Sequence, residues 1–211
     1  MGNKSNTGDV NQKKSVIKKT IDFFKDERFK IILFILLLAL AIYLSFAFIS
    51  YLFTWKQDQS FSYSEVISGP EITVDNWAGK QGAELGRIFL GEWFGIASFI
   101  IPFLLVLIAF KLIDKNFLPF WKSIRISLIG IILLSVTLGF VSGDTEGYLG
   151  SGLGGFHGYV VSQWLTAIFG SVGTILILFV LLSSYIIFSI PSSTTYLKKF
   201  FYRPAVVKAS T

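Results

Sequence analysis

Residues 150–155 read GSGLGG, and Gly150, Gly152 and Gly155 have the G-x-G-x-x-G spacing of a dinucleotide-binding turn. In such a turn a β-strand leads into the glycines, and the helix that follows meets a pyrophosphate with its N-terminus. Here the preceding residues instead predict the end of an apolar helix, and no lysine follows in the phosphate-binding pattern G-x-x-x-x-G-K-[ST]. We therefore expect no nucleotide at this segment, and we expect its glycines to allow close helix contact or a reentrant turn.

His157 is the second candidate for chemistry, as the only histidine of a chain that has no cysteine. Asp144 and Glu146 precede it on the same segment, so the three side chains could ligate a metal ion or sense pH. The alternative is a histidine that is hydrogen-bonded at the membrane surface, which we favour because no second histidine is present. A chain without cysteine also forms no disulfide and no thiolate cluster. We predict no catalytic residue, no cofactor site and no metal site.

The elements that must position these residues are apolar. Of the 211 residues 53% are hydrophobic and 15% are charged, whereas soluble domains have about 25% charged residues. Uncharged runs predict an all-α integral membrane fold with four transmembrane helices, at about 31–54, 94–111, 124–142 and 168–190. A fifth crossing near 159–169 is disfavoured by the glycines and polar side chains there. The cores of the spans contain no charged residue, so they lack the usual mark of a transport path.

Lysine and arginine are distributed unevenly among the segments that join these spans. Eight precede the first span, four lie between the second and third spans and four follow the fourth, so sixteen of the nineteen share one side. The other side has Lys56, Lys80 and Arg87, together with eight of the thirteen acidic residues. Because cytoplasmic segments retain Lys and Arg, we predict that both termini are cytoplasmic. The loops at about 55–93 and 143–167 are then external.

The chain divides into three parts on this basis. Residues 1–30 form a basic cytoplasmic tail, in which apolar residues recur at helical spacing. This tail is either a partly amphipathic helix attracted to anionic lipid or a solvated segment that only sets the topology. Residues 31–190 form the four-span membrane domain, and residues 191–211 begin a cytoplasmic linker.

The first external loop ends in a predicted amphipathic helix at the membrane interface, with Leu85, Ile88, Phe89 and Trp93 on one face. Small residues here and in the glycine-rich segment let helices approach closely. The external aromatic residues either seat the helices at the lipid interface or form a contact surface for a partner. The candidate residues for helix packing and partner contact are Asn76, Trp77, Gly79, Gly82, Ala83, Gly86, Gly95, Pro102, Gly150, Gly154 and Gly155.

A resemblance to a known family lies in the segment VDNWAGKQGAELGRIFLGEWFGIASFIIPFLLVLIAFKLI. It resembles the part after the first span in the four-span N-terminal domain of the FtsK/SpoIIIE DNA translocases. The matching positions are Asn76, Gly79, Gly82, Ala83, Gly95 and Pro102. The stretch GYLGSGLGG, followed by FGSVGTILILFVLL, is similar to the family's glycine-rich entry to the fourth span. The resemblance covers about residues 31–190.

The resemblance implies a membrane anchor at the division septum of the bacterial cytoplasmic (inner) membrane, in contact with membrane lipids and with other division proteins. In the family a hexameric motor follows and pumps double-stranded DNA during cell division and chromosome segregation, which also implies self-association.

The 211 residues contain no Walker motif. We therefore assign no enzyme activity to them, and we expect ATP, Mg²⁺ and DNA only at the missing motor. The sequence is expected to be a truncated form or a gene fragment. The alternative function is a small four-span transporter or channel subunit.

Overall fold

The computed structural model of the chain describes residues 18, 26–58, 73–143, 147–190, 192, 193, 195 and 198. All elements among these residues are helical. In chain order they are α2 (Glu27–Asp58), α4 (Gly79–Gly86), the π-helix η1 (Arg87–Trp93), the 3₁₀-helix η2 (Gly95–Phe99), α5 (Ile100–Leu112), α6 (Phe120–Ser142), the 3₁₀-helix η3 (Tyr148–Gly150) and α7 (Gly155–Ser189). Four helical stretches are long and apolar enough to cross a membrane: Glu27–Asp58, Gly95–Leu112, Phe120–Ser142 and Gly155–Ser189. The predicted all-α fold with four membrane-spanning helices is confirmed.

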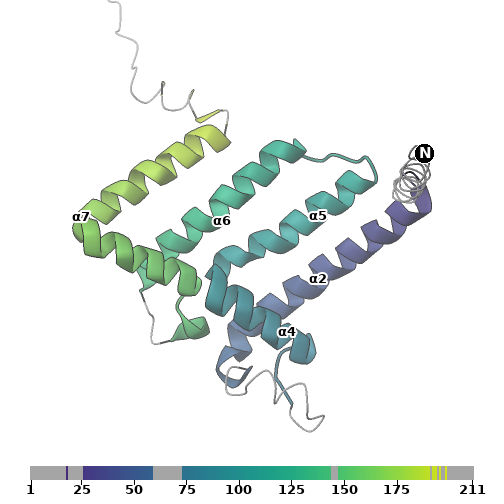
Figure 1. Cartoon of the computed structure of the whole chain (residues 1–211), viewed down its shortest axis with the longest axis horizontal. Coiled ribbons are helices and arrows are strands. Elements are labelled where there is room, and N and C mark those ends of the chain that lie inside the picture. Colours follow the sequence, from purple (N-terminus) through teal and green to yellow (C-terminus); the bar gives the residue numbers. More distant parts are fainter. Residues whose placement is uncertain are drawn as a thin grey trace, which may run out of the picture.

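The four long helices lie side by side in one row, in the order in which they follow in the chain (Figure 1). α2 packs on α5 and α6 packs on α7, while the contact between α5 and α6 is smaller. α2 and α7 form the two edges of the row and keep large apolar side chains exposed, among them Ile32 (64%) and Phe179 (67%). Lipid tails are as apolar as these side chains, so a membrane covers such faces at little cost.

The helix boundaries differ from the expected ones at two places. α2 reaches from Glu27 to Asp58 and so continues past the charged residues at both ends of the apolar run. α7 begins at Gly155, so residues 155–167, which the sequence places in the second external loop, are helical. α7 bends at Gly170 (φ 68°, ψ 170°), and its second part follows the expected fourth span (Figure 1).

Several predictions concern residues outside those that the structure describes. The first is the amphipathic character of the tail, because only Lys18 is described before residue 26. The second is the linker 191–211, most of which is not described. The third is the possible role of Asp144 and Glu146 beside His157.

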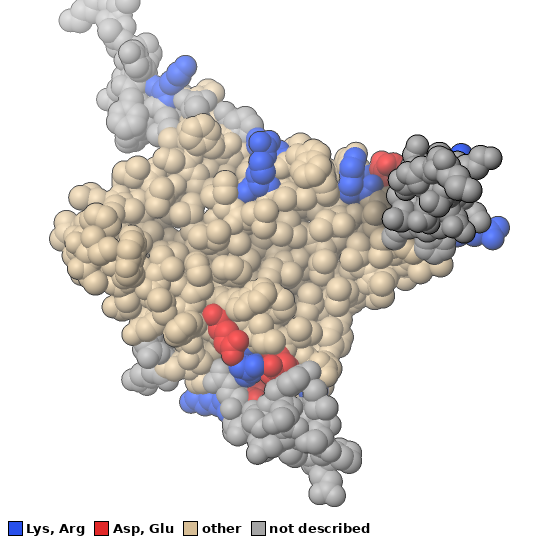
Figure 2. Space-filling view, in the orientation of Figure 1, with Lys and Arg blue, Asp and Glu red and all other residues tan. Residues whose placement is uncertain are grey.

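Charged side chains gather at the two ends of the row. One end, called the basic end below, carries Lys30, Lys111, Lys115, Lys122 and Arg125. Figure 2 shows Lys and Arg side chains along this end of the visible face and acidic side chains mostly at the other. The other end, called the loop side, carries α4, η1, η2 and η3.

The best-buried core lies toward the loop side. Its fully buried side chains include Phe48 and Tyr51 of α2, Leu90 of η1 and Leu149 of η3. The Phe48 ring lies 5.6 Å from the ring of Phe89 and 5.6 Å from that of Phe99, and offset or edge-on aromatic pairs stabilise a core beyond their buried area. This core joins α2 to the short helices of the loop side and holds them in place.

Candidate interaction surface

Residues 75–78, which lead into α4, run along the side of α2 and are bonded to it. Four hydrogen bonds join them to α2: from the Asp75 N–H to Asp58 Oδ1 (3.1 Å), from Asn76 Nδ2 to the Ala47 carbonyl (3.1 Å), from the Trp77 N–H to Ser50 Oγ (2.9 Å) and from the Tyr43 hydroxyl to the Ala78 carbonyl (2.8 Å). Ser50 and Asp58 are buried at 0% and 6% exposure. Buried polar groups are stable when they are paired in this way, so the start of α4 is fixed to α2.

Asn76 combines one bond to α2 with two bonds inside the segment that leads into α4. Its side chain is buried, donates through Nδ2 to Ala47 and accepts the Ala78 N–H through Oδ1 (3.0 Å). Its backbone carbonyl accepts the Gly79 N–H (2.8 Å), which starts the first turn of α4. The amide side chain supplies both the donor and the acceptor that this position uses. The residue therefore organises the entry to α4.

The small residues of α4 pack on α2 within the chain. Gly82, Ala83 and Gly86 are buried. A Cβ on Gly82 would lie 2.7 Å from Asn76 Oδ1, and one on Gly86 would lie 2.6 Å from the Tyr51 ring. A larger side chain at either glycine would separate α4 from α2. Substitution of these glycines therefore tests folding, and a partner surface must be sought on exposed residues.

The chain changes helix type between α4 and α5. η1 is a π-helix, a rare form that is frequent at functional sites. At its end the Phe89 carbonyl accepts both the Phe94 N–H (3.1 Å) and the Ser98 hydroxyl (2.5 Å). Two residues after Phe94, the Ile96 N–H donates to the Leu153 carbonyl (2.9 Å). The start of the second span is thus bonded to the glycine-rich segment before α7.

The glycines of GSGLGG form tight turns and a helix contact. Gly150 and Gly152 donate their N–H groups to the carbonyls of Gly147 and Tyr148, both at 2.7 Å. Gly154 lies so close to the backbone of α6 that a Cβ would overlap Ser135 and Gly139, and the contact continues at Gly158. η3, not a strand, leads into the motif. The expected close helix contact is confirmed, and α6 is the helix that is approached.

His157 lies in this contact. Ser135 Oγ donates to the Gly154 carbonyl (2.7 Å) and lies 3.2 Å from His157 Nδ1. The imidazole also meets the Phe94 ring edge-on at 5.1 Å. Among the described residues no three His, Cys, Asp or Glu side chains are grouped so that they could hold a metal ion. His157 therefore packs α7 against α6 and against the residue that follows η1.

The residues beside this packing form what we call the aromatic–acidic surface, which consists of the half-buried Glu84 and Arg87 and the exposed Glu92, Trp93 and Phe156. Arg87 donates through Nε to Glu84 Oε2 (2.8 Å) and pairs with both carboxylates. The Glu84 hydrogen bond, with smaller contributions from both charges, raises the pKa of Arg87 above its ordinary value. Trp93 and Phe156 are 47% and 56% exposed.

This surface rests on a rigid base. The Trp93 ring packs edge-on against Phe89 at 4.9 Å, and Phe89 belongs to the loop-side core. A Cβ on Gly155 would lie 2.6 Å from the Trp93 carbonyl, so Phe156 follows directly after the point where α7 meets η1. Exposed aromatic rings with a charged rim are typical of residues that dominate binding to other proteins.

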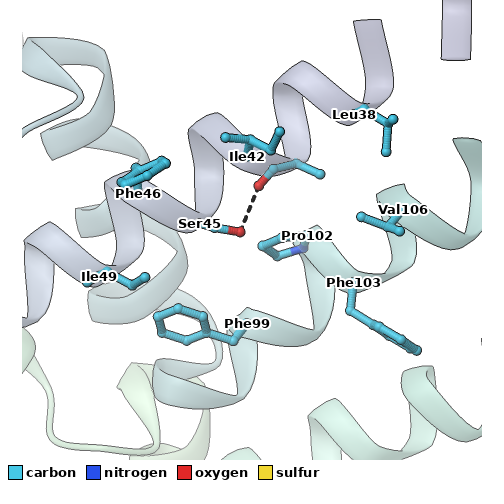
Figure 3. A pocket seen from close by; sticks show the side chains of 10 residues that line it. Leu38, Ile42, Ser45, Phe46, Ile49, Phe99, Pro102, Phe103 and Val106 are labelled. Atoms are coloured by element: carbon cyan, nitrogen blue, oxygen red, sulfur yellow. Dashed lines mark hydrogen bonds between the residues drawn. The ribbon is translucent and has the colours of Figure 1, made fainter. Parts of the chain in front are cut away.

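The remaining candidate residues lie elsewhere. Trp77 is 66% exposed and Gly79 is also exposed. Pro102 is buried in the first turn of α5, a position where proline is tolerated. With Ser45, whose hydroxyl donates to the Ala41 carbonyl (2.8 Å), it lines an apolar cavity of about 470 Å³ between α2 and α5 (Figure 3).

Sequence reasoning missed Ser50, Asp58 and Ser135 as organising residues. Each is a buried polar residue in or at the end of an apolar helix, and each binds backbone from another segment. A single buried serine in a span has an ordinary explanation, a hydrogen bond to its own helix. The sequence therefore had no signal that separates Ser50 and Ser135 from the other hydroxyl residues of the spans.

A family model described as the 4TM region of DNA translocase FtsK/SpoIIIE matches residues 26–200. A search of curated proteins and a search of solved structures give no significant match. The matched range contains every helix from α2 to α7, including the loop-side helices and the glycine-rich turn. The chain therefore belongs to the family of the four-transmembrane region of the FtsK/SpoIIIE DNA translocases, a membrane anchor region.

Proposed function

We propose that the chain anchors a DNA translocase at the division septum of a bacterial cytoplasmic membrane and thereby serves cell division and chromosome segregation. The match of residues 26–200 to the family carries the proposal. ATP, Mg²⁺ and DNA would be handled by a motor outside these residues, and this region would hold that motor at the membrane.

The basic end would face the cytoplasm in this function. Sixteen of the nineteen Lys and Arg residues belong to the tails and to the segment between α5 and α6, and positive charge beside the spans is retained in the cytoplasm. The aromatic–acidic surface would then lie outside the cytoplasm, where it is accessible to the external part of another division protein.

Contact with other division proteins would use the aromatic–acidic surface. The Trp93 ring packs on Phe89 of the loop-side core, so it is held in place before a partner binds, which lowers the entropy lost on binding. Copies of the chain would also associate, because the motor of the family is a hexamer.

Septal recruitment is the property to test. The full chain is fused at its C-terminus to a fluorescent protein and imaged in dividing cells, together with the double variant Glu92→Lys, Trp93→Ala. We expect a septal band for the wild type and an even membrane signal for the double variant. Trp121→Ala is the matched control, because Trp121 is an exposed tryptophan (72%) at the basic end.

The control should keep the septal band, and immunoblots of membrane fractions should show equal amounts of all three proteins. An even distribution of the wild type in dividing cells would contradict septal anchoring. A septal band for the double variant would place the contact on another surface.

A further inference from the structure

A groove lies between α6 and the second part of α7 and opens near the basic end. It has a volume of about 590 Å³, within the range of about 300–1,000 Å³ that is usual for ligand sites. Its lining residues are Lys122, Arg125, Ile126, Ile129 and Leu133 of α6, and Leu181, Ser184, Tyr185, Phe188 and Ser189 of α7. No acidic side chain is among these lining residues. The groove is therefore apolar along its length and positively charged at one end.

The bottom of the groove is built by a close contact of the two helices. The Tyr185 hydroxyl donates to the Ile126 carbonyl (3.1 Å). A Cβ on Gly130 would lie 2.5 Å from the Tyr185 hydroxyl oxygen, so glycine lets this ring lie against α6. Tyr185 thus joins the helices, while the larger apolar side chains on both sides of it line the space above.

The two cations at the mouth are available for an anion. The ion pairs between described residues are Lys30–Asp114, Arg87–Glu84 and Arg87–Glu92, so neither Lys122 nor Arg125 pairs with a carboxylate there. Arg125 donates through Nε to the Trp121 carbonyl (3.3 Å), which orients the guanidinium. The two residues are three positions apart on α6, so they lie on one face of the helix.

The length of the groove matches one leaflet of a bilayer. From Lys122 to Leu133 the helix rises about 17 Å at ~1.5 Å per residue. Half of the hydrocarbon core of a bilayer is about 15 Å thick. The cations therefore lie at the depth of the lipid headgroups when the apolar part of the groove lies beside the acyl chains. Figure 1 shows that α6 begins and α7 ends at this same end of the row.

We propose that this groove binds one anionic phospholipid, with its phosphate on Lys122 and Arg125 and an acyl chain along Ile129, Leu133 and Leu181. The combination of charge and shape selects this ligand. A free anion makes no use of an apolar groove, whereas a phospholipid supplies a phosphate for the two cations and an acyl chain for the apolar part. Basic pockets between transmembrane helices bind anionic headgroups in this way.

The test uses the full chain, purified in a neutral detergent and mixed with micelles that contain either phosphatidylglycerol or phosphatidylcholine. Native mass spectrometry then counts the lipids that each chain retains. We expect one retained phosphatidylglycerol and markedly less phosphatidylcholine. The double variant Lys122→Gln, Arg125→Gln should lower the apparent affinity for phosphatidylglycerol about fivefold for each charge removed.

Two further variants separate the site from general surface charge. Lys111→Gln with Lys115→Gln removes two cations of the basic end that do not line the groove, and it should leave retention unchanged. Ser184→Trp fills the groove and keeps both cations, and it should lower the retention of phosphatidylglycerol as much as the double charge variant does.

The proposal is overturned if both lipids are retained equally, or if the two charge variants lose retention to the same extent. It is also overturned if Ser184→Trp retains the lipid, or if the spectra show a lipid-free dimer that this variant dissociates, because a second copy would then occupy the groove. Circular dichroism of every variant should show unchanged helix content.

Discussion

Gly95 and Gly155 lie backbone against backbone, although 60 positions separate them. A Cβ on Gly95 would lie 2.5 Å from the Gly155 nitrogen, and a Cβ on Gly155 would lie 2.5 Å from the Gly95 nitrogen. Both residues have positive φ, +63° and +68°, which side chains other than glycine rarely adopt. This contact joins the start of the second span to the start of α7.

Gly95→Ala should lower the free energy of unfolding more than the same substitution at a glycine that has a similar φ but no close neighbours. Gly79 is the matched control, because its φ is +68° and no atom lies within 4 Å of an added Cβ. We expect Gly79→Ala to cost about 1–2 kcal/mol from backbone strain alone. Gly95→Ala adds an overlap with the Leu153 carbonyl and should cost more than that. Thermal unfolding in detergent, followed by circular dichroism, measures the difference, and equal melting temperatures would contradict the contact.

Asn76→Ala should loosen α4 from α2. The substitution removes the two hydrogen bonds of the Asn76 side chain, to the Ala47 carbonyl and from the Ala78 N–H, and a hydrogen bond contributes about 0.5–1.5 kcal/mol net. Hydrogen exchange of the α4 amides should become faster, while exchange in α6 stays unchanged. Gln81→Ala, an exposed position of the same helix, is the control. Unchanged exchange in Asn76→Ala would show that the other bonds suffice to hold the segment.

Gly170→Ala should straighten α7 or strain it. The backbone at Gly170, with φ 68° and ψ 170°, lies in a region that is almost exclusive to glycine, and holding alanine there costs about 1–3 kcal/mol. Because the chain has no cysteine, spin labels can be placed at Val160→Cys and Val180→Cys. The distance between them should lengthen toward about 30 Å, the value for 20 residues of continuous helix. Ser171→Ala should keep the wild-type distance, and a short distance in Gly170→Ala with unchanged stability would contradict a glycine-dependent bend.

The orientation in the membrane can be measured with the same cysteine-free background. Asn116→Cys lies at the basic end and Gln81→Cys on the loop side, and both positions are exposed. A maleimide that does not cross membranes should label intact cells only at position 81, and both positions after the cells are opened. Labelling of position 116 in intact cells would reverse the proposed orientation.

The number of spans could be predicted because the hydrocarbon core tolerates few charges, and four runs from Ile31 onward are free of them. The spacing of Gly82 and Gly86 indicated a close helix contact for a similar reason, since small residues permit it. Glycine spacing does not, however, say which helix approaches. The contact of α4 with Tyr51 of the same chain depends on the tertiary fold, and no pattern in the sequence predicts it.

Other features escaped prediction because they depend on long-range packing. The bond from the Asp75 N–H to Asp58 joins residues 17 positions apart, and the bond from the Tyr148 hydroxyl to the Leu52 carbonyl joins residues 96 positions apart. Gly170 lies near the start of the predicted fourth span, and the sequence does not distinguish its bend from an ordinary helical glycine. The end of η1 depends in the same way on the Phe89 carbonyl, which accepts both the Phe94 N–H and the Ser98 hydroxyl.

The arrangement of the four helices in a single row has a mechanical consequence. In the row α7 packs along α6, while α2 lies at the far edge. A tension applied at the end of α7 is therefore not shared at once by the other three long helices, as it would be in a closed bundle. The load passes first as shear along the α6–α7 contact and reaches the rest of the molecule through the backbone contacts of Gly139, Gly154 and Gly95. The glycine contacts of the loop side are thus the anchorage through which α7 resists being pulled out of register.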